Sequence, residues 1–238
     1  ANMHSVMNYL FSKQILSKQK EKLNKRGFFE RLSQPENSKD RKLISDLATK
    51  QGMTYLADQS GTNIDVQIFD LSKVDFSDSY LSEVIDDTNA VIIVMDYAFG
   101  EQAFETMDEL LKPYKKGING PVKLNVDSVS IMGKAGILKG GKGDIMIPHA
   151  HVFEGTTDNY PFVNEITLAD FEDEDIEATE GHMITVLGTS LQNKETLSYF
   201  KNSTWKVIGL EMEGAHYQKA IQAASKIRNS ICSDVKVR

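Results

Sequence analysis

The fold is decided by two stretches, Val129-Ser130-Ile131-Met132-Gly133-Lys134-Ala135-Gly136-Ile137-Leu138, which continues in Lys142-Gly143-Asp144-Ile145-Met146-Ile147-Pro148, and Val207-Ile208-Gly209-Leu210-Glu211-Met212-Glu213-Gly214-Ala215. Each is an apolar run of β type that stops abruptly at small residues or carboxylates. An α/β protein presents a ligand pocket in this way, at the ends of its strands. We therefore expect both stretches to contribute to one site.

Strands and helices alternate along the rest of the chain. The patterns predict strands over residues 64–71, 90–95, 127–132, 144–153, 183–188 and 206–212, and helices over 5–25, 40–50, 194–200 and 214–231, with another helix through 104–111. This alternation is typical of an α/β fold with a mixed sheet and helices on both sides, in three layers. We expect an N-terminal helical extension over residues 1–60 and an α/β domain over 61–238.

The run Ala90-Val91-Ile92-Ile93-Val94-Met95 is continuously apolar. A strand that alternates has one buried face, whereas a continuous run is typical of a parallel strand buried on both faces. We predict such a strand here.

Composition excludes several classes of protein. The 238 residues carry a formal charge of −7, which argues against a general nucleic-acid binder, since that class needs a basic surface. No apolar run approaches a membrane span, and no signal-peptide pattern opens the sequence. The single cysteine, Cys232, fits a reducing compartment, so we expect a cytoplasmic protein.

Charge is distributed unevenly. Residues 1–50 contain 11 basic and 5 acidic side chains, a balance of +6 that leaves −13 for the remainder. A solvated helix face explains this basic region better than an RNA-binding or membrane-binding arm. The acidic run over residues 170–180 lacks the regular ligand spacing of a calcium loop and is interpreted as an exposed loop.

The segment Gly133-Lys134-Ala135-Gly136 follows a strand that we expect to be interior. Small residues at such a point let a planar ligand or a ribose approach the backbone. The run does not match the phosphate-binding pattern G-x-x-x-x-G-K-[ST]. Lys139-Gly140-Gly141-Lys142 is interpreted as a surface turn.

Glu211 and Glu213 flank Met212 directly after a predicted strand. A carboxylate at a pocket rim accepts two hydrogen bonds from a vicinal diol, as a ribose offers, and Met212 would pack softly against a sugar or base. The alternative is that Glu213 is simply an acid favoured by the dipole of the following helix. Both interpretations can hold together.

His149 and His151 share one face of a predicted strand, a geometry that can bind a metal. A third ligand is not evident, so we expect a solvated pair and no metal. For His216, on the first turn of the last helix, we expect a packing role.

Taken together, the motifs resemble the nucleoside phosphorylase and nucleosidase superfamily over residues 90–225. Its G-x-A-G-G loop and following G-D-[IV] strand start are matched by Gly133 to Leu138 and by Gly143-Asp144-Ile145, its V-E-M-E-[GA]-A strand end by Leu210 to Ala215, and its G-D/T-x-Φ loop by Gly188-Thr189-Ser190-Leu191. The resemblance implies a small-molecule nucleoside or nucleotide ligand and a homo-oligomer. It also implies that Gly133, Ala135, Gly136, Thr189, Leu191 and Met212 line the substrate and that Glu213, with Glu211, is catalytic.

The chain departs from this family at several places, two of which bear on the reaction. Where phosphorylases hold phosphate with an arginine, it has the acidic and aromatic segment Asp96 to Glu101, which disfavours an anionic co-substrate. The family also places a catalytic aspartate after one more strand, of which Val235-Lys236-Val237-Arg238 resembles the start.

Two functions follow as hypotheses. The first is cleavage of a nucleoside-type N-glycosidic bond, by hydrolysis rather than phosphorolysis and without a cofactor. The second is a non-catalytic nucleoside- or nucleotide-binding module of the same fold.

Overall fold

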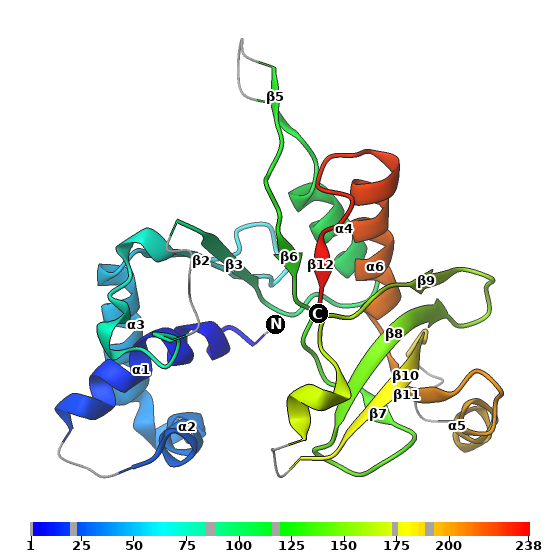
Figure 1. Cartoon of the computed structure of the whole chain (residues 1–238), viewed down its shortest axis with the longest axis horizontal. Coiled ribbons are helices and arrows are strands. Elements are labelled where there is room, and N and C mark those ends of the chain that lie inside the picture. The colour runs from blue at the N-terminus through cyan, green and yellow to red at the C-terminus, as the bar shows by residue number, and fades with distance from the viewer. Residues whose placement is uncertain (1, 20–22, 84–88, 116–119, 173–175, 189–192) are drawn as a thin grey trace. The chain divides into compact units, whose positions relative to one another are not determined.

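The computed structural model describes residues 2–19, 23–83, 89–115, 120–172, 176–188 and 193–238. The chain forms two compact units, Ala1–Tyr97 and Ala98–Arg238. Helices and sheets alternate in a mixed α/β architecture, so the predicted fold class is confirmed (Figure 1). The domain boundary at residue 60 stays a prediction.

The first unit packs three helices on an antiparallel sheet. The helices are α1 (Ser5–Lys18), α2 (Lys25–Ser33) and α3 (Ser38–Lys50), and the strands are β1 (Met53–Leu56), β2 (Val66–Asp70) and β3 (Val91–Met95), in the order β1-β2-β3. Large apolar side chains that are fully buried form its core: Leu10, Phe11, Phe28, Ile44 and Phe69. The helix predicted over residues 5–25 is therefore α1, with α2 starting as a separate helix at Lys25.

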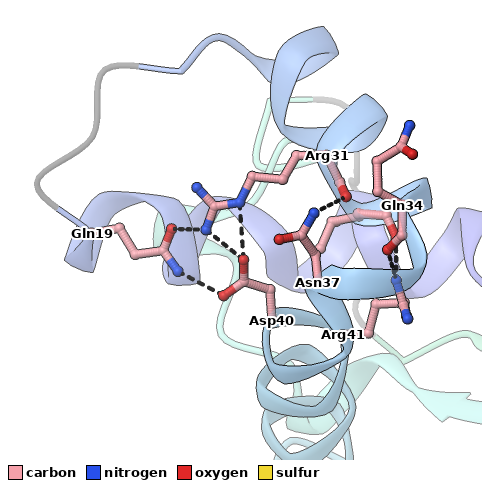
Figure 2. Close-up of polar contacts among 7 residues, drawn as sticks. Gln19, Arg31, Gln34, Asn37, Asp40 and Arg41 are labelled. Atoms are coloured by element: carbon pink, nitrogen blue, oxygen red, sulfur yellow. Dashed lines mark hydrogen bonds and ion pairs between the residues drawn. The ribbon is translucent and has the colours of Figure 1, made fainter.

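A polar cluster ties the three helices together (Figure 2). The Arg31 guanidinium donates to Asp40 Oδ2 over 3.1 Å from Nε and 2.5 Å from Nη2, and to Gln19 Oε1 over 3.1 Å. Gln19 in turn donates to Asp40 Oδ1 over 3.0 Å. Asp40 is nearly buried, and these three donors supply the partners that a buried carboxylate requires.

The prediction for the run Ala90–Met95 is wrong. β3 pairs antiparallel with β2 at the edge of its sheet, with Phe69 opposite Ile92. Val94 is 5% exposed, whereas Val91 and Ile93, on the other face, are 55% and 41% exposed. A continuous apolar run is typical of a strand that is buried on both faces. In β3 only the face that carries Val94 is buried, against the helical core of the first unit.

The second unit is built on a five-stranded sheet. Its strands are β7 (Gly136–Ile137), β8 (Ile145–Phe153), β9 (Asn159–Pro161), β10 (Ala178–Thr185) and β11 (Val207–Glu211), in the order β7-β11-β10-β8-β9. The three central strands β11, β10 and β8 are parallel, and the edge strands β7 and β9 are antiparallel to their neighbours. The predicted mixed sheet is thus present in this unit.

Helices cover both faces of this sheet. On one face, Leu197 and Phe200 of α5 (Lys194–Lys201) pack on the core of Val152, Ile184 and Leu210. On the other face lies α6 (Gly214–Gln222), which contacts β8, β9 and β10. The unit has three layers because successive side chains of a strand point to opposite faces.

The helix α6 continues into a π turn over Ala223–Ile227 and packs along α4 (Gln102–Leu110). The Arg228 guanidinium reaches Asp108 over 2.5 Å, and the Ser230 hydroxyl donates to the Leu111 carbonyl over 2.7 Å. The helix predicted over residues 214–231 therefore ends four residues earlier, at Ile227.

Two small sheets and four short 3₁₀ turns complete the described elements. β4 (Tyr114–Lys115) pairs with β5 (Pro121–Val122), and β6 (Ser128–Val129) pairs in parallel with β12 (Lys236–Val237). The 3₁₀ turns are Pro35–Asn37, Leu71–Lys73, Phe76–Asp78 and Leu168–Phe171. Among the described residues, no helix combines the length and apolar character needed to cross a bilayer.

Candidate functional site

The candidate site lies at the carboxyl ends of the three parallel strands of the second unit. Phe153, Thr185 and Glu211, the last residues of β8, β10 and β11, are ladder partners in one row. β7 pairs antiparallel with β11, with Gly136 opposite Leu210. Ala135, which precedes Gly136, therefore lies at the same edge of the sheet as Glu211 and Glu213. Ligands of α/β proteins bind at this edge of the sheet.

Glu211 is the polar centre of this edge. Its side chain is 10% exposed, and Oε1 accepts hydrogen bonds from the Thr185 hydroxyl and from His151 Nδ1, the latter over 3.2 Å. Oε2 accepts from the amide of Glu213, over 2.6 Å, and from the amide of Gly214. Burial by itself raises the pKa of Glu211, but the bond and charge of His151, with the bonds from Thr185 and Gly214, together hold this pKa below its usual value.

These contacts close the N-terminus of α6. Glu211 accepts from the amides of Glu213 and Gly214, and the Thr185 hydroxyl oxygen accepts from the Ala215 amide over 2.9 Å. The leading N–H groups of a helix lack partners within the helix and commonly bind anions. Here the side chains of two strand ends already occupy three of them.

Glu213 is half-buried and faces the segment before α4. Its Oε1 accepts from the Gly100 amide over 2.9 Å, and Gly100 has a φ of +54°, which favours glycine. Burial and the charge of Glu211 raise the pKa of Glu213, and the Gly100 and Met212 amides offset part of that rise. A carboxylate has about four acceptor positions, so Glu213 keeps capacity for a ligand.

Aromatic rings lie beside this acidic centre. Phe153 makes edge contacts with His216, at 4.7 Å between ring centroids, and with Tyr160, at 6.0 Å. Burial lowers the pKa of His216 against the opposing charges of Glu101 and Glu211. Rings of this kind offer an apolar surface for a base.

Four of the six predicted substrate-lining residues lie in the described part of the chain. Gly133 and Ala135 are exposed in the irregular segment before β7, and Gly136, the first residue of β7, is exposed too. Met212 is half-buried, and its Cε lies 3.5 Å from the position that a Cβ would take on Gly188. Thr189 and Leu191 lie outside the described residues.

The prediction of a solvated histidine pair is wrong for His151. His149 is partly exposed and lies 3.3 Å from Glu180, but His151 is 5% exposed, stacks on Phe162 and bonds Glu211. β8 carries irregular pairing near Gly181 of its neighbour, which a regular alternation does not anticipate. No group of three or more potential metal-ligating side chains is found in the described part of the chain.

Sequence reasoning missed His151, Thr185 and Gly100 as members of the site. The signal for Thr185 was its place as the one hydroxyl in the apolar run Met183–Leu187. Gly100 carried a signal as the glycine that begins the turn before a helix. His151 could not be recognised from the sequence, because its contact with Glu211 depends on how β8, β10 and β11 are aligned.

A groove of about 320 Å³ lies in the first unit, between α1 and α3. Its lining consists of Ile15, Lys18, Gln19, Leu43, Asp46, Leu47 and Lys50. This lining lacks the paired carboxylates and the backbone donors found at the strand ends, so we place the candidate site at the strand ends.

Solved structures that are similar to the chain include nucleosidases. They include futalosine hydrolase of Helicobacter pylori strain 26695, at 15% identity and a TM-score of 0.46, with 72% of each chain covered. A putative methylthioadenosine nucleosidase from Weissella paramesenteroides has 15% identity and a TM-score of 0.48, covering 81% of this chain and 75% of that one. A methylthioadenosine/S-adenosylhomocysteine nucleosidase from Colwellia psychrerythraea 34H, solved with adenine, has 12% identity and a TM-score of 0.46, covering 74% and 70%.

Residues 2–237 match the model of a family described as "Family of unknown function (DUF6909)". The chain belongs to this family, and the match includes both compact units. None of the curated proteins compared with the chain matches it.

Proposed function

We propose that the protein cleaves the N-glycosidic bond of a nucleoside-type substrate with water. The observation that carries the proposal is the half-buried Glu213, held by the Gly100 amide at the strand edge where Ala135 also lies. Cleavage builds positive charge on the ribose, so a site needs oriented contacts to the ribose hydroxyls and favourable charge more than a nucleophile.

In this proposal the residues have separate parts. Glu213 accepts hydrogen bonds from the ribose diol and stabilises the developing positive charge. Met212, Ala135 and Gly136 line the sugar and the base, together with Gly133, Thr189 and Leu191. Glu211 holds the backbone of Glu213 in place and does not contact the substrate, because its two oxygens already accept from four protein donors.

Water is the proposed acceptor rather than phosphate. The charges of Glu101 and Glu211 both act on His216, and the charge of Glu211 acts on Glu213. Glu211 and Thr185 occupy three of the leading amides of α6, those of Glu213, Gly214 and Ala215. A phosphate placed there would meet like charge at a helix start where these three amides are already bonded.

An assay of free-base release from adenosine, with and without inorganic phosphate, tests the proposal. We expect base release without phosphate, and a fall in kcat/KM of about a hundredfold for Glu213→Gln, since one group that stabilises transition-state charge is lost. Glu195→Gln, on the exposed start of α5, is the control and should leave the rate unchanged. Full activity in Glu213→Gln would rule the proposal out.

A non-catalytic nucleoside- or nucleotide-binding module is the second candidate. It is favoured because Glu211 is occupied by hydrogen bonds from the protein. Of the two acids Glu211 and Glu213, Glu213 is the one that keeps acceptor capacity for a ligand. Thermal shift by adenosine or AMP without any base release would support this candidate over the enzyme.

We further propose that the ligand is a small nucleoside or nucleotide, that the reaction needs no cofactor, and that the protein is a cytoplasmic homo-oligomer. Sedimentation velocity tests the last point, and a single species at the mass of the 26.6 kDa chain would contradict it.

A further inference from the structure

We propose that His151 is a positioning residue for the ribose-binding acid Glu213 and that it acts through Glu211. This inference rests on the proposed function of Glu213. It assigns a part in substrate binding to a buried imidazole on β8, a different strand from the one that ends in Glu211.

The first link is the contact between His151 and Glu211. The two side chains are 7% and 10% exposed, and Nδ1 lies 3.2 Å from Oε1. A carboxylate only accepts hydrogen bonds, so Nδ1 must carry the proton in this pair. His151 therefore fixes Oε1 together with the Thr185 hydroxyl, which bonds the same oxygen.

The second link runs from Glu211 to the backbone of Glu213. With Oε1 held by two side chains, Oε2 accepts from the Glu213 and Gly214 amides. The Glu213 carboxylate then reaches the Gly100 amide over 2.9 Å. The place of the ribose-binding oxygens thus depends on the place of the Glu211 carboxylate.

The third observation is that the imidazole has little freedom to move. Its ring stacks on Phe162 with a 5.8 Å centroid distance and planes 4° apart. Gly214 also lies against the ring, since a Cβ there would overlap both Nδ1 and Cε1. A ring in contact with both an aromatic side chain and a helix start transmits its position directly to that helix start.

The experiment compares two probes, adenosine and 2′,3′-dideoxyadenosine, each as its carbocyclic analogue, which has no N-glycosidic bond to cleave. Calorimetric titration of the full chain measures the binding of each probe. His151→Phe keeps the stack on Phe162 but removes the donor to Glu211. We expect it to weaken adenosine binding about tenfold, the size of one lost charge-assisted hydrogen bond. Binding of the dideoxy probe, which lacks the hydroxyls that Glu213 would accept from, should change less than twofold.

Two further variants keep the test independent of folding. His151→Asn places an amide N–H near the position of Nδ1 and should restore adenosine binding to within about threefold of the unmutated protein. His149→Phe changes the neighbouring imidazole of the same strand, whose partner is the partly exposed Glu180, and should affect neither probe. Circular dichroism checks that each variant is folded.

The outcomes distinguish failure of the positioning role of His151 from failure of the proposed nucleoside site. Equal loss of both probes in a folded His151→Phe, or unchanged binding of both, would overturn the positioning part while leaving the nucleoside site intact. If the unmutated protein binds neither probe, the proposed function fails and this inference fails with it.

Discussion

At the scale of single residues, Glu211 and Glu213 lie two positions apart but have pKa values shifted in opposite directions. Bonds from His151, Thr185 and Gly214 hold the pKa of Glu211 down against burial, whereas burial and the charge of Glu211 raise that of Glu213. Acids whose environments separate their pKa values commonly take different parts in a site. Glu211 is thus suited to permanent charge and Glu213 to contact with a ligand.

The raised pKa of Glu213 makes a prediction about stability. An acid whose folded pKa is raised destabilises the native state above that pKa, because the native state disfavours the charged form. Glu213→Gln should therefore increase the free energy of unfolding at pH 7. The gain should vanish near pH 3, where both folded and unfolded glutamates are protonated. Urea denaturation at the two pH values measures this, and a loss of stability at pH 7 would contradict it.

The contact between Gly214 and His151 makes a second prediction. Gly214→Ala forces a methyl group into the imidazole and should cost about 1–3 kcal/mol. His151→Ala removes the ring, so adding it to Gly214→Ala should cost less than the sum of the single changes. A double-mutant cycle by urea denaturation gives the coupling, and strict additivity would show that the two positions do not meet.

At the scale of elements, the first unit depends on a polar tie between its helices. Arg31, Asp40 and Gln19 come from three separate segments, and Asp40 accepts from both partners (Figure 2). Asp40→Ala should cost about 1–3 kcal/mol, since it leaves a partly buried guanidinium without its carboxylate. Glu30→Ala breaks an exposed i,i+4 pair with Arg26 and should change stability by less than about 0.5 kcal/mol. Thermal unfolding compares the two, and equal effects would contradict the assignment.

Much of the element pattern was predictable because it depends on local periodicity. The helices at residues 40–50 and 194–200 and the strands at 144–153 and 206–212 match α3, α5, β8 and β11 closely. The direction of β3 was not predictable, because an apolar run does not specify which strand pairs with it. The short β7, inside what the sequence predicted as a loop, exists only through its pairing with β11.

In the candidate site, too, some residues were predictable from the local sequence and others depend on how the strands pair. Glu213 was predicted from its place after an apolar run, which forms β11. The interior strand predicted before Gly133 is wrong, since only Ser128–Val129 forms a strand there and it pairs with β12 outside the five-stranded sheet. Pairing of β7 with β11 brings Ala135 and Glu213 to one edge. His151 and Thr185 were missed because their role depends on the register of β8, β10 and β11. Thr189 and Leu191 stay predictions.

At the scale of the whole molecule, the described side chains of the candidate site belong to residues 98–238. A core change in the first unit should therefore destabilise the protein without changing nucleoside affinity. Phe69→Ala, at a fully buried position, should cost about 3–5 kcal/mol and leave adenosine binding within about twofold at 15 °C.

The matched change in the second unit is Leu210→Ala, also fully buried and one residue before Glu211. It should cost about 2–5 kcal/mol and weaken adenosine binding as well. Calorimetric titration of both folded variants makes the comparison. Loss of affinity in Phe69→Ala alone would show that the site depends on the first unit.

The π turn at Ala223–Ile227 indicates where the last long helix tolerates a change of length. A turn closed by an i→i+5 bond, here from the Arg228 amide to the Ala223 carbonyl over 2.8 Å, contains one residue more than an α-helical turn. Removing one residue there would convert it to regular α-helix and leave the orientation of Gly214, His216 and Gln218 unchanged. Removing one residue upstream would instead rotate the downstream residues by about 100° about the helix axis. Evolutionary or engineered shortening by one residue thus keeps the packing of the last helical turns on α4 when it falls within the π turn, downstream of Gln222.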